Sequence, residues 1–436
     1  MDPDKLDEND WRYHGEGNKS LVVSHIQVSV FKIHFPNKKS EQAYRQIQNI
    51  VDFTSNVMSC FIGEQFIHSG EVVKLPLEFV RQLSIKVQHQ RPVWRCNKVM
   101  DIYSGCALCL PNLTTPLYHQ PTLTPPICIE IKPKCGFLPS SKHVSKEIKT
   151  RVCRFCMHQH YKVSNGIWKK RSLYCPLDLF SGSRQRMTFA IRHLIEEPQN
   201  NFKIFKVNPW GLKQFNNGNI TIDFLFKTVQ LINVKILSIS YGPAVLSVLY
   251  LTLFLFNLWC LDSQGLPSDC VLSRVLHTQR LDSLDIEGLF PLYKRVEQHL
   301  HHFPKERSRL QVEGPYDEMF LEKLQKCPSE DDGSVEYATT KVHQYRAAMT
   351  AKDCSIMITL MPTSSLTFRT FSFSVAVLDL DPKPFESVPR QLRLDQKVVN
   401  GYLRSSSGIC PKTPQQREDC TLLFHPVRPA PLALLL

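Results

Sequence analysis

Residues 130–139 read EIKPKCGFLP, and this stretch decides the fold. It continues a run in which isoleucines stand at alternate positions, 127, 129 and 131, and a period of two predicts a β-strand with one buried face. Successive side chains of a strand point to opposite faces, so Glu130, Lys132 and Lys134 are predicted to project together, away from the isoleucines.

The ammonium groups of Lys132 and Lys134 are therefore expected side by side on stiff backbone, near one carboxylate. Pro133 cannot donate a ladder hydrogen bond and marks the end of the strand or a sheet edge. Paired ammonium groups suit a multiply charged anion such as phosphate. The alternative is a solvated outer face of a sheet, but the proline, the Cys-Gly turn after it and the basic run downstream favour an anion site.

Length and composition predict an intracellular globular protein. The 436 residues are enough for one large or two ordinary domains, and 42% apolar with 21% charged residues is an ordinary globular balance. Fifteen cysteines are too few for a disulfide scaffold of this size. The acidic, polar start MDPDKLDENDW predicts no secretory signal, so we expect reduced thiols.

The formal net charge of +13 is unevenly distributed. Residues 130–174 hold eleven lysines and arginines and only two acidic residues. Such a cluster predicts an anionic partner: nucleic acid, membrane headgroups or a polyphosphate. Charge alone does not choose among them.

The N-terminal part predicts strands joined by a glycine turn. Gly15 and Gly17 precede an apolar run, and a Gly-x-Gly turn between strands lays backbone N–H groups over a phosphate, although an ordinary hairpin turn gives the same pattern. Lys32 lies in the next strand, 26–35. Helices are predicted over 40–53 and 77–87, and further strands over 71–75 and 106–112.

The basic segment contains Cys153, Cys156, His158 and His160, which with Cys175 allow a zinc site. The spacing fits no common zinc module, and an amphipathic helix over 145–163 is the favoured interpretation. A second helix is predicted over 183–197, stopped by Pro198. An Asn200–Asn201 pair follows at its exit, in what is otherwise read as a turn.

Residues 244–261 form an apolar run long enough to span a bilayer. We expect a buried helix or a peculiarity of this chain instead. A spanning helix would separate the basic segment before the run from the globular elements after it. The Pro/Leu-rich tail, 426–436, is predicted to be disordered and outside the core.

The C-terminal part predicts helices over 285–300 and 316–324, then one over 335–349 capped by Ser334. Strands over 354–360 and 371–377 follow. If they form a hairpin, Asp353 and Asp379 share one end of it. A helix, an aspartate at a strand start, a hairpin and an aspartate at its exit are the parts of a kinase-type phosphoryl-transfer site. Two turn aspartates are the alternative.

Several segments resemble the inositol-pentakisphosphate 2-kinase family of animals. They include YHGEGNKSLVV at 13–23, EIKPKCGF at 130–137, VCRFCMHQH at 152–160, TAKDCSIMI at 350–358 and VLDLDPKP at 377–384. The resemblance covers most of 11–207 and 281–400. It implies an enzyme that transfers the γ-phosphate of ATP, with Mg²⁺, to the 2-hydroxyl of inositol 1,3,4,5,6-pentakisphosphate, giving inositol hexakisphosphate (phytate).

The resemblance also implies an α+β, two-lobed kinase-like fold. Residues 1–110 would form an N-terminal lobe with an antiparallel sheet. Residues 111–425 would form a larger mixed α/β C-terminal lobe that carries the inositide-binding region and, at 208–261, a segment unlike the family. The family is cytoplasmic and nuclear, and a monomer without stable membrane insertion is expected.

Matching motifs transfer roles to positions of this chain. For the nucleotide they are Gly15, Gly17, Asn18, Lys32, Lys203 and Met357, the last under the adenine. For the inositide they are Arg95, Lys132, Lys134, His158, Lys162, Asn200, Asn201 and Lys383. Asp353 would be the catalytic base and Asp379 the magnesium ligand. The chain departs from plant relatives at Ser387 and Gln391, where they carry a basic and an aromatic substrate contact, and it lacks a match to their zinc site.

Two other functions remain as alternatives: a non-catalytic inositol-polyphosphate-binding protein and a nucleic-acid-binding protein. A non-catalytic relative would lose the aspartate pair, whereas Asp353 and Asp379 are both present. Nucleic-acid binders interleave aromatic side chains with basic ones, and residues 130–174 show no repeating pattern of that kind. A membrane-bound kinase, resting on 244–261 alone, is a third and weaker option.

Overall fold

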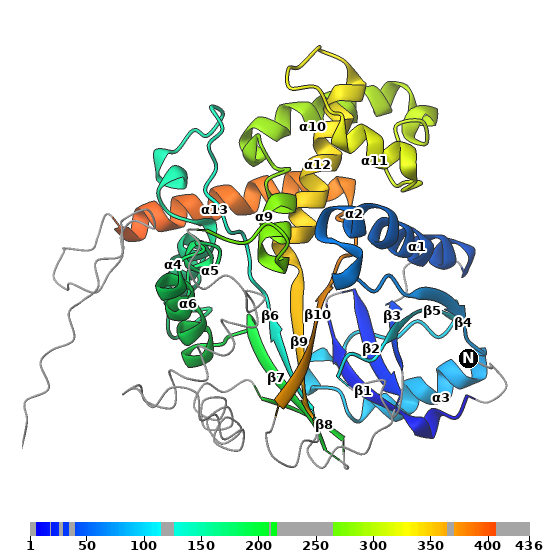
Figure 1. Cartoon of the computed structure of the whole chain (residues 1–436). Helices are drawn as coiled ribbons and strands as arrows, with labels where there is room; N and C mark the ends of the chain where they lie inside the picture. The colour runs from blue at the N-terminus through cyan, green and yellow to red at the C-terminus, as the bar shows by residue number, and fades with distance from the viewer. Residues whose placement is uncertain are drawn as a thin grey trace, which may run out of the picture.

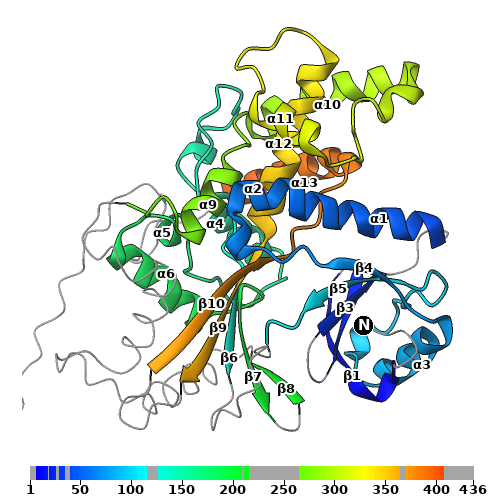
Figure 2. The ribbon, with the colours of Figure 1, turned by 45° about the vertical axis from the view of Figure 1, so that its right-hand side comes forward.

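The computed structural model describes residues 6–17, 19–25, 29–34, 40–114, 126–208, 211–215, 265–363 and 370–406. In these residues the chain forms two five-stranded antiparallel sheets with helices packed around them (Figure 1). The first sheet comes from the N-terminal part, and Figure 2 shows it beside the second. The antiparallel sheets and the mixture of helix and strand confirm the coarse fold prediction.

The first sheet has the order β1-β2-β3-β5-β4. Its strands are β1 (Trp11–Glu16), β2 (Ser20–His25), β3 (Ser29–His34), β4 (Glu71–Lys74) and β5 (Cys106–Pro111). Alternate apolar residues of β2 and β3, such as Leu21 and Phe31, are buried against α3 (Leu77–Gln88). This is the one-faced burial that a period of two predicts.

The helix predicted over 40–53 continues further than its periodicity indicated. After α1 (Ser40–Asp52) the chain forms a π-helical stretch, Phe53–Met58, and then α2 (Ser59–Ile62). Phe53 and Val57 are buried in the core of the second sheet. The continuous helix therefore joins the two sheets, because it starts over the first and packs into the second (Figure 2).

The second sheet has the order β10-β9-β6-β7-β8. Its strands are β6 (Ile127–Ile131), β7 (Phe202–Asn208), β8 (Gly211–Phe215), β9 (Ser355–Thr363) and β10 (Thr370–Leu378). The strand at residues 127–131 is thus the central strand of this sheet, and all five of its residues are buried. The solvated-face alternative is wrong, because Cys128, on the face opposite the isoleucines, packs with Phe205 and Met357.

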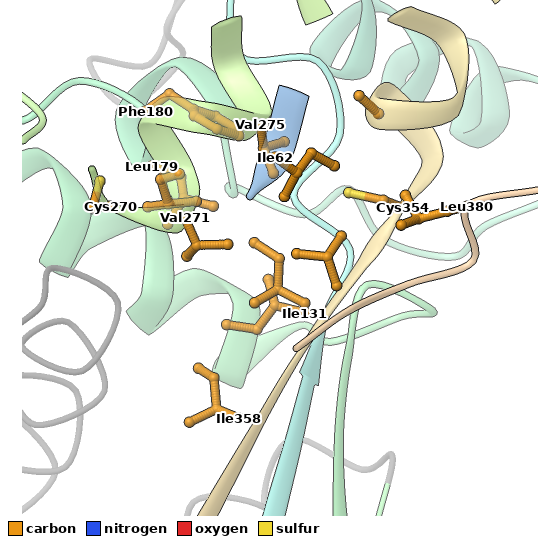
Figure 3. Packing of buried hydrophobic residues seen from close by; sticks show 14 of the residues in the cluster. Ile62, Ile131, Leu179, Phe180, Cys270, Val271, Val275, Cys354, Ile358 and Leu380 are labelled. Carbon is orange, nitrogen blue, oxygen red and sulfur yellow. The ribbon is translucent and has the colours of Figure 1, made fainter. Parts of the chain in front are cut away.

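The isoleucine face of β6 carries the main core. In Figure 3, Ile131 of β6 and Ile358 of β9 lie among Leu179 of α5 (Pro176–Leu179) and Val271 and Val275 of α9 (Val271–Gln279). Fully burying one such aliphatic side chain is worth about 1.5–3 kcal/mol. This packing holds the end of β6, where Pro133 follows, at a defined place beside the helices.

The remaining helices are α4 (Arg154–Ser164), α6 (Arg184–Glu196), α10 (Asp285–His302), α11 (Glu318–Gln325), α12 (Val335–Asp353) and α13 (Val388–Ser406). The helix predicted over 145–163 is shorter than expected. Cys153 has extended backbone, and its sulfur accepts a hydrogen bond from the Cys156 N–H, so the helix begins only at Arg154. Residues Glu147–Thr150 form a separate 3₁₀ turn.

Ser334 caps α12 as predicted, because its Oγ accepts a hydrogen bond from the Tyr337 N–H at 3.0 Å. The helix runs to Asp353, four residues beyond the predicted end at 349. Asp353 therefore sits on the last turn of a helix, where the partial negative charge of the helix disfavours a carboxylate. Compensating positive charge is required there.

None of the described helices is long and apolar enough to cross a membrane. The apolar run 244–261 and the tail 426–436 both lie outside the described residues, so the predictions made for them are not tested.

His343 on α12 gives a prediction about stability. Burial beside Arg346 lowers the pKa of His343 from 6.5 to about 3, while its Nε2 lies 3.1 Å from the Leu310 carbonyl. The unfolded chain takes up this proton near pH 6.5 and the folded chain does not, so native stability should fall as the pH drops from about 6.5 toward 3. In thermal melts of the ligand-free protein, the midpoint should fall less steeply with pH between about 6.5 and 3 in His343→Gln than in the unaltered protein. Equal slopes would contradict the assignment.

Candidate active site

The two predicted aspartates meet at one end of the β9–β10 hairpin. Leu378 of β10 pairs with Ser355 of β9, so Asp379 follows one strand where Asp353 precedes the other. This confirms the hairpin arrangement on which the pairing of the two aspartates depended. Both carboxylates remain open to solvent on one side.

Each aspartate is held by lysine. Lys134 Nζ lies 3.3 Å from Asp353 Oδ1, and Lys383 Nζ lies 2.8 Å from Asp353 Oδ2. Lys132 Nζ lies 2.8 Å from both Asp379 Oδ2 and Ser355 Oγ. The predicted carboxylate beside the lysine pair is present, since Lys132 Nζ lies 3.6 Å from Glu130 Oε1, but the structure adds a carboxylate partner for each lysine that the sequence did not predict. Each ammonium group has its own carboxylate from a distant part of the chain. Asp379 lies 247 positions after Lys132, and Asp353 lies 219 positions after Lys134.

The charges set the ionisation of both carboxyl groups. Desolvation by the surrounding protein raises the pKa of Asp353, but Lys134 and Lys383 outweigh it and hold that pKa below its ordinary value. Desolvation is likewise outweighed at Asp379, where Lys132 and Lys32 hold the pKa far below its ordinary range. Both aspartates are thus anionic at neutral pH.

Glu130 links the aspartates to the neighbouring strand. Its Oε1 accepts a hydrogen bond from Ser355 Oγ at 2.8 Å, and its Oε2 lies 3.1 Å from Lys203 Nζ. Lys203 stands opposite Glu130 in the β6–β7 register, which explains the contact. The family resemblance placed Lys203 near the nucleotide, and the strand alternation placed Glu130 as the carboxylate beside the two lysines, without the contact to Ser355.

A cavity of about 340 Å³ opens beside Asp353. The predicted site residues that line it are Lys134, His158, Lys162, Asn200, Asn201, Asp353 and Lys383. Burial and the nearby Lys134 lower the pKa of Lys162, and burial with Lys162, Arg154 and Lys134 lowers that of His158 to about 4. The cavity thus brings cationic groups close together, and a bound anion would offset their mutual repulsion.

Asn201 adds an unsatisfied polar atom to this cavity. Its main-chain carbonyl accepts a hydrogen bond from Lys132 N–H at 2.8 Å, which fixes the loop before β7 against the exit of β6. Its side-chain Oδ1 is buried without a partner among the described residues. A hydroxyl or ammonium donor would satisfy this atom, so the asparagine pair fits a ligand site better than a simple turn.

The nucleotide predictions fall on the first sheet and on the face between the sheets. Gly15 and Gly17 belong to the β1–β2 hairpin, and no atom lies within 4 Å of where a side chain would stand. Asn18 lies outside the described residues. Met357 is 5% exposed and packs beside Phe205.

Two predicted residues have unexpected contacts. Lys32 reaches across to the second sheet and pairs with Asp381, with Nζ 2.7 Å from Oδ1. Arg95 is not among the residues that line the cavity, since its guanidinium donates to the Gly17 carbonyl at 3.2 Å and lies over the Trp94 ring. It therefore stands beside the glycine turn in this structure.

Sequence reasoning missed Asp381 and Arg154. Asp381 stands two positions after Asp379 in the motif Asp-Leu-Asp, which was a usable signal. Arg154 lines the cavity and its Nε lies 2.8 Å from Asp395. Positions 154, 158 and 162 are spaced by four, and this spacing places three cationic or imidazole groups on one face of α4.

The cysteines partly support the zinc alternative. Sulfur atoms of Cys153, Cys156 and Cys175 lie within 4.8 Å of one another, but neither histidine belongs to this cluster. His158 lines the cavity, and His160 contacts Arg171 and Tyr402. The amphipathic helix is present as α4, and its N-terminal cap is one of the three cysteines.

Comparisons with known proteins agree with this geometry. A family model described as inositol-pentakisphosphate 2-kinase matches residues 13–397. An inositol-pentakisphosphate 2-kinase of the zebrafish Danio rerio is 49% identical and covers 98% of this chain and 100% of its own length. Proteins of that name from rice and from Arabidopsis thaliana are 30% and 28% identical, over 94% and 93% of this chain and 97% and 96% of their own lengths.

Proposed function

The chain belongs to the inositol-pentakisphosphate 2-kinase family, and from this we propose how its residues perform the reaction. It is a kinase that phosphorylates inositol pentakisphosphate at the 2-position to give the hexakisphosphate, with ATP as the donor. The observation that carries the assignment of residues is the cationic cavity that ends at Asp353. The two sheets act as two lobes of a kinase-like fold, divided near residue 110, with the nucleotide held between them.

The inositide occupies the cavity. Lys134, His158, Lys162 and Lys383 bind its phosphate groups, and Asn200 and Asn201 orient the ring by hydrogen bonds. Many donors from several elements are needed because the phosphates point in all directions around one ring. Support comes from Lys162, which has no carboxylate partner among the hydrogen bonds of the described residues and lies against Trp168.

Asp353 accepts the proton of the 2-hydroxyl group. The hydroxyl oxygen attacks the γ-phosphorus, the bond from that phosphorus to the β–γ bridging oxygen breaks, and ADP leaves. In the ligand-free protein Lys134 and Lys383 hold the pKa of Asp353 low, which makes it a weak base. Phosphates of the substrate attract the same two lysines, so binding raises the basicity of Asp353 when it is needed.

Asp379 would hold Mg²⁺, which would neutralise charge on the donor phosphates. An anionic carboxylate with Glu130 and Ser355 close by offers the oxygen ligands that a hard cation prefers. Lys132, now paired with Asp379, would be free to bind a phosphate when Asp379 binds the metal instead. Lys32 and Lys203 serve the donor phosphates, and Met357 lies under the base.

Asp379→Asn is expected to weaken magnesium dependence and nucleotide use together, because an amide oxygen is a poorer ligand than a carboxylate for a hard cation. Initial rates across a magnesium titration measure this. Asp269→Asn, at an exposed aspartate that does not line the cavity, is the matched control. A magnesium curve unchanged in Asp379→Asn would remove this residue from the metal site.

The reaction itself is tested by incubating the protein with inositol pentakisphosphate and ATP labelled on the γ-phosphate. We expect label on the 2-position of the product, resolved by chromatography against position isomers. Binding of the inositide without transfer would instead favour the non-catalytic alternative, which the paired aspartates of the hairpin argue against.

A further inference from the structure

His14 occupies an irregular position in β1. Tyr13 pairs with Val23 and Gly15 pairs with Val22, so His14 has no partner on β2 and forms a β-bulge. A bulge turns one side chain out of the regular alternation, and bulges are frequent next to active sites for this reason. Here the bulge directs His14 out of the first sheet toward the second.

The ring of His14 lies on Phe205 of β7, with 6.1 Å between ring centroids and 20° between planes. Phe205 forms an apolar patch with Cys128 and Met357, and these three side chains are 4%, 0% and 5% exposed. His14 therefore covers the patch from the opposite sheet. Its Nδ1 is buried and has no partner among the described residues.

The polarity along β6 shows what this patch faces. Cys128, Glu130 and Lys132 stand at alternate positions on one side of the strand path. Cys128 belongs to the apolar patch, Glu130 forms an ion pair with Lys132, and Lys132 contacts Asp379. A molecule lying along this line meets an apolar surface at one end and the catalytic carboxylates at the other. A nucleotide has this polarity, with a flat base at one end and phosphates at the other.

We propose that His14 is the roof of the slot for the nucleotide base, stacking on the base from above while Phe205 and Met357 lie below. The proposal rests on the use of ATP proposed above. A base between two rings needs two stacking separations, roughly 7 Å in all. The ring of His14 now stacks on Phe205 itself, so it must move away from that ring to admit a base.

Burial lowers the pKa of His14 to about 4 against the effect of Glu130. The imidazole is thus neutral at physiological pH and presents a flat aromatic face. A phenylalanine ring at this position would do the same, whereas alanine would leave the base uncovered on one side. A leucine fills the space without offering a flat aromatic face, so His14→Leu separates stacking from simple filling of space.

The test is calorimetric titration of ADP and of inorganic tripolyphosphate, which has no base, into the full chain. For His14→Ala we expect about 5- to 150-fold weaker ADP binding, the range of a lost base–aromatic stack. His14→Phe should stay within about threefold of the unaltered protein. Tripolyphosphate binding should be unchanged in both. His89→Ala, an exposed histidine after α3, is the control and should bind ADP normally.

The rate measurement should show the same separation. The KM for ATP should rise in His14→Ala while kcat and the KM for the inositide hold, since the base is bound equally in ground and transition states. Equal or tighter ADP binding by His14→Ala, or a loss in His14→Phe as large as in His14→Ala, overturns the proposal. If the alanine variant does not fold, His14→Leu replaces it, with the same loss expected. Failure of the unaltered protein to bind ADP would instead refute the proposed use of nucleotide.

Discussion

The Asp353→Asn variant should bind the inositide normally and transfer phosphate about 10²- to 10⁴-fold more slowly, the usual contribution of a general base. Asparagine keeps the shape of the side chain and part of its hydrogen bonding but cannot accept the proton. Single-turnover rates with labelled ATP measure the loss, and calorimetry with inositol hexakisphosphate measures binding.

The structure also predicts how inositide affinity should change in Asp353→Asn. Asp353 pairs with Lys134 and Lys383, so removing its charge frees both ammonium groups for phosphates. Inositide affinity should therefore hold or rise in Asp353→Asn while turnover collapses. Turnover above about a tenth of the unaltered rate would exclude Asp353 as the base. A parallel loss of affinity would show instead that the site had been disturbed.

The Lys134→Met and Lys162→Met double variant should bind inositol hexakisphosphate at least two orders of magnitude more weakly. Each charge-assisted contact to a phosphate is worth about 1.5–3 kcal/mol, so two lost contacts correspond to roughly 10²- to 10⁴-fold. Methionine keeps most of the apolar stem of lysine, which limits the loss of packing. Protection of the protein against thermal unfolding by the inositide should shrink accordingly.

A matched control uses Lys142→Met with Lys146→Met. These exposed lysines lie in the same basic segment and do not line the cavity, yet the double change removes the same two charges. If both double variants lose affinity equally, the inositide is attracted by the overall positive charge of the basic segment and is not bound specifically in the cavity. If the Lys134 and Lys162 variant binds normally, the cavity is not the inositide site.

The structure also changes the expectation for Lys132. A free pair of like charges would make its removal neutral or stabilising, but Lys132 lies among Asp379, Glu130 and Ser355. Replacing it leaves two carboxylates close together without their shared cation. Lys132→Met should therefore lower the thermal midpoint of the ligand-free protein, because two carboxylates that lose their shared cation repel each other. For this reason Lys162, and not Lys132, is the better partner for Lys134 in the binding test.

The sequence by itself determined the strand of residues 127–131, the approximate extent of most helices, the Ser334 cap and the meeting of Asp353 with Asp379. These features depend on local causes. Side-chain alternation sets the faces of a strand, Ser334 caps α12, and an antiparallel hairpin brings the start of one strand to the end of the next. Each of these causes acts over a short stretch of chain, so the pattern of residues records it.

Only the tertiary structure decided the partners. Lys132 pairs with Asp379 across 247 positions, Lys32 pairs with Asp381 across 349, and His14 lies on Phe205 from another sheet. The burial of both faces of β6 likewise depends on distant segments, because helices cover the isoleucine face and Phe205 and Met357 pack against Cys128 on the other. Nothing in the local periodicity encodes these contacts, because charges and rings from distant segments are matched only when packing brings the two sheets together.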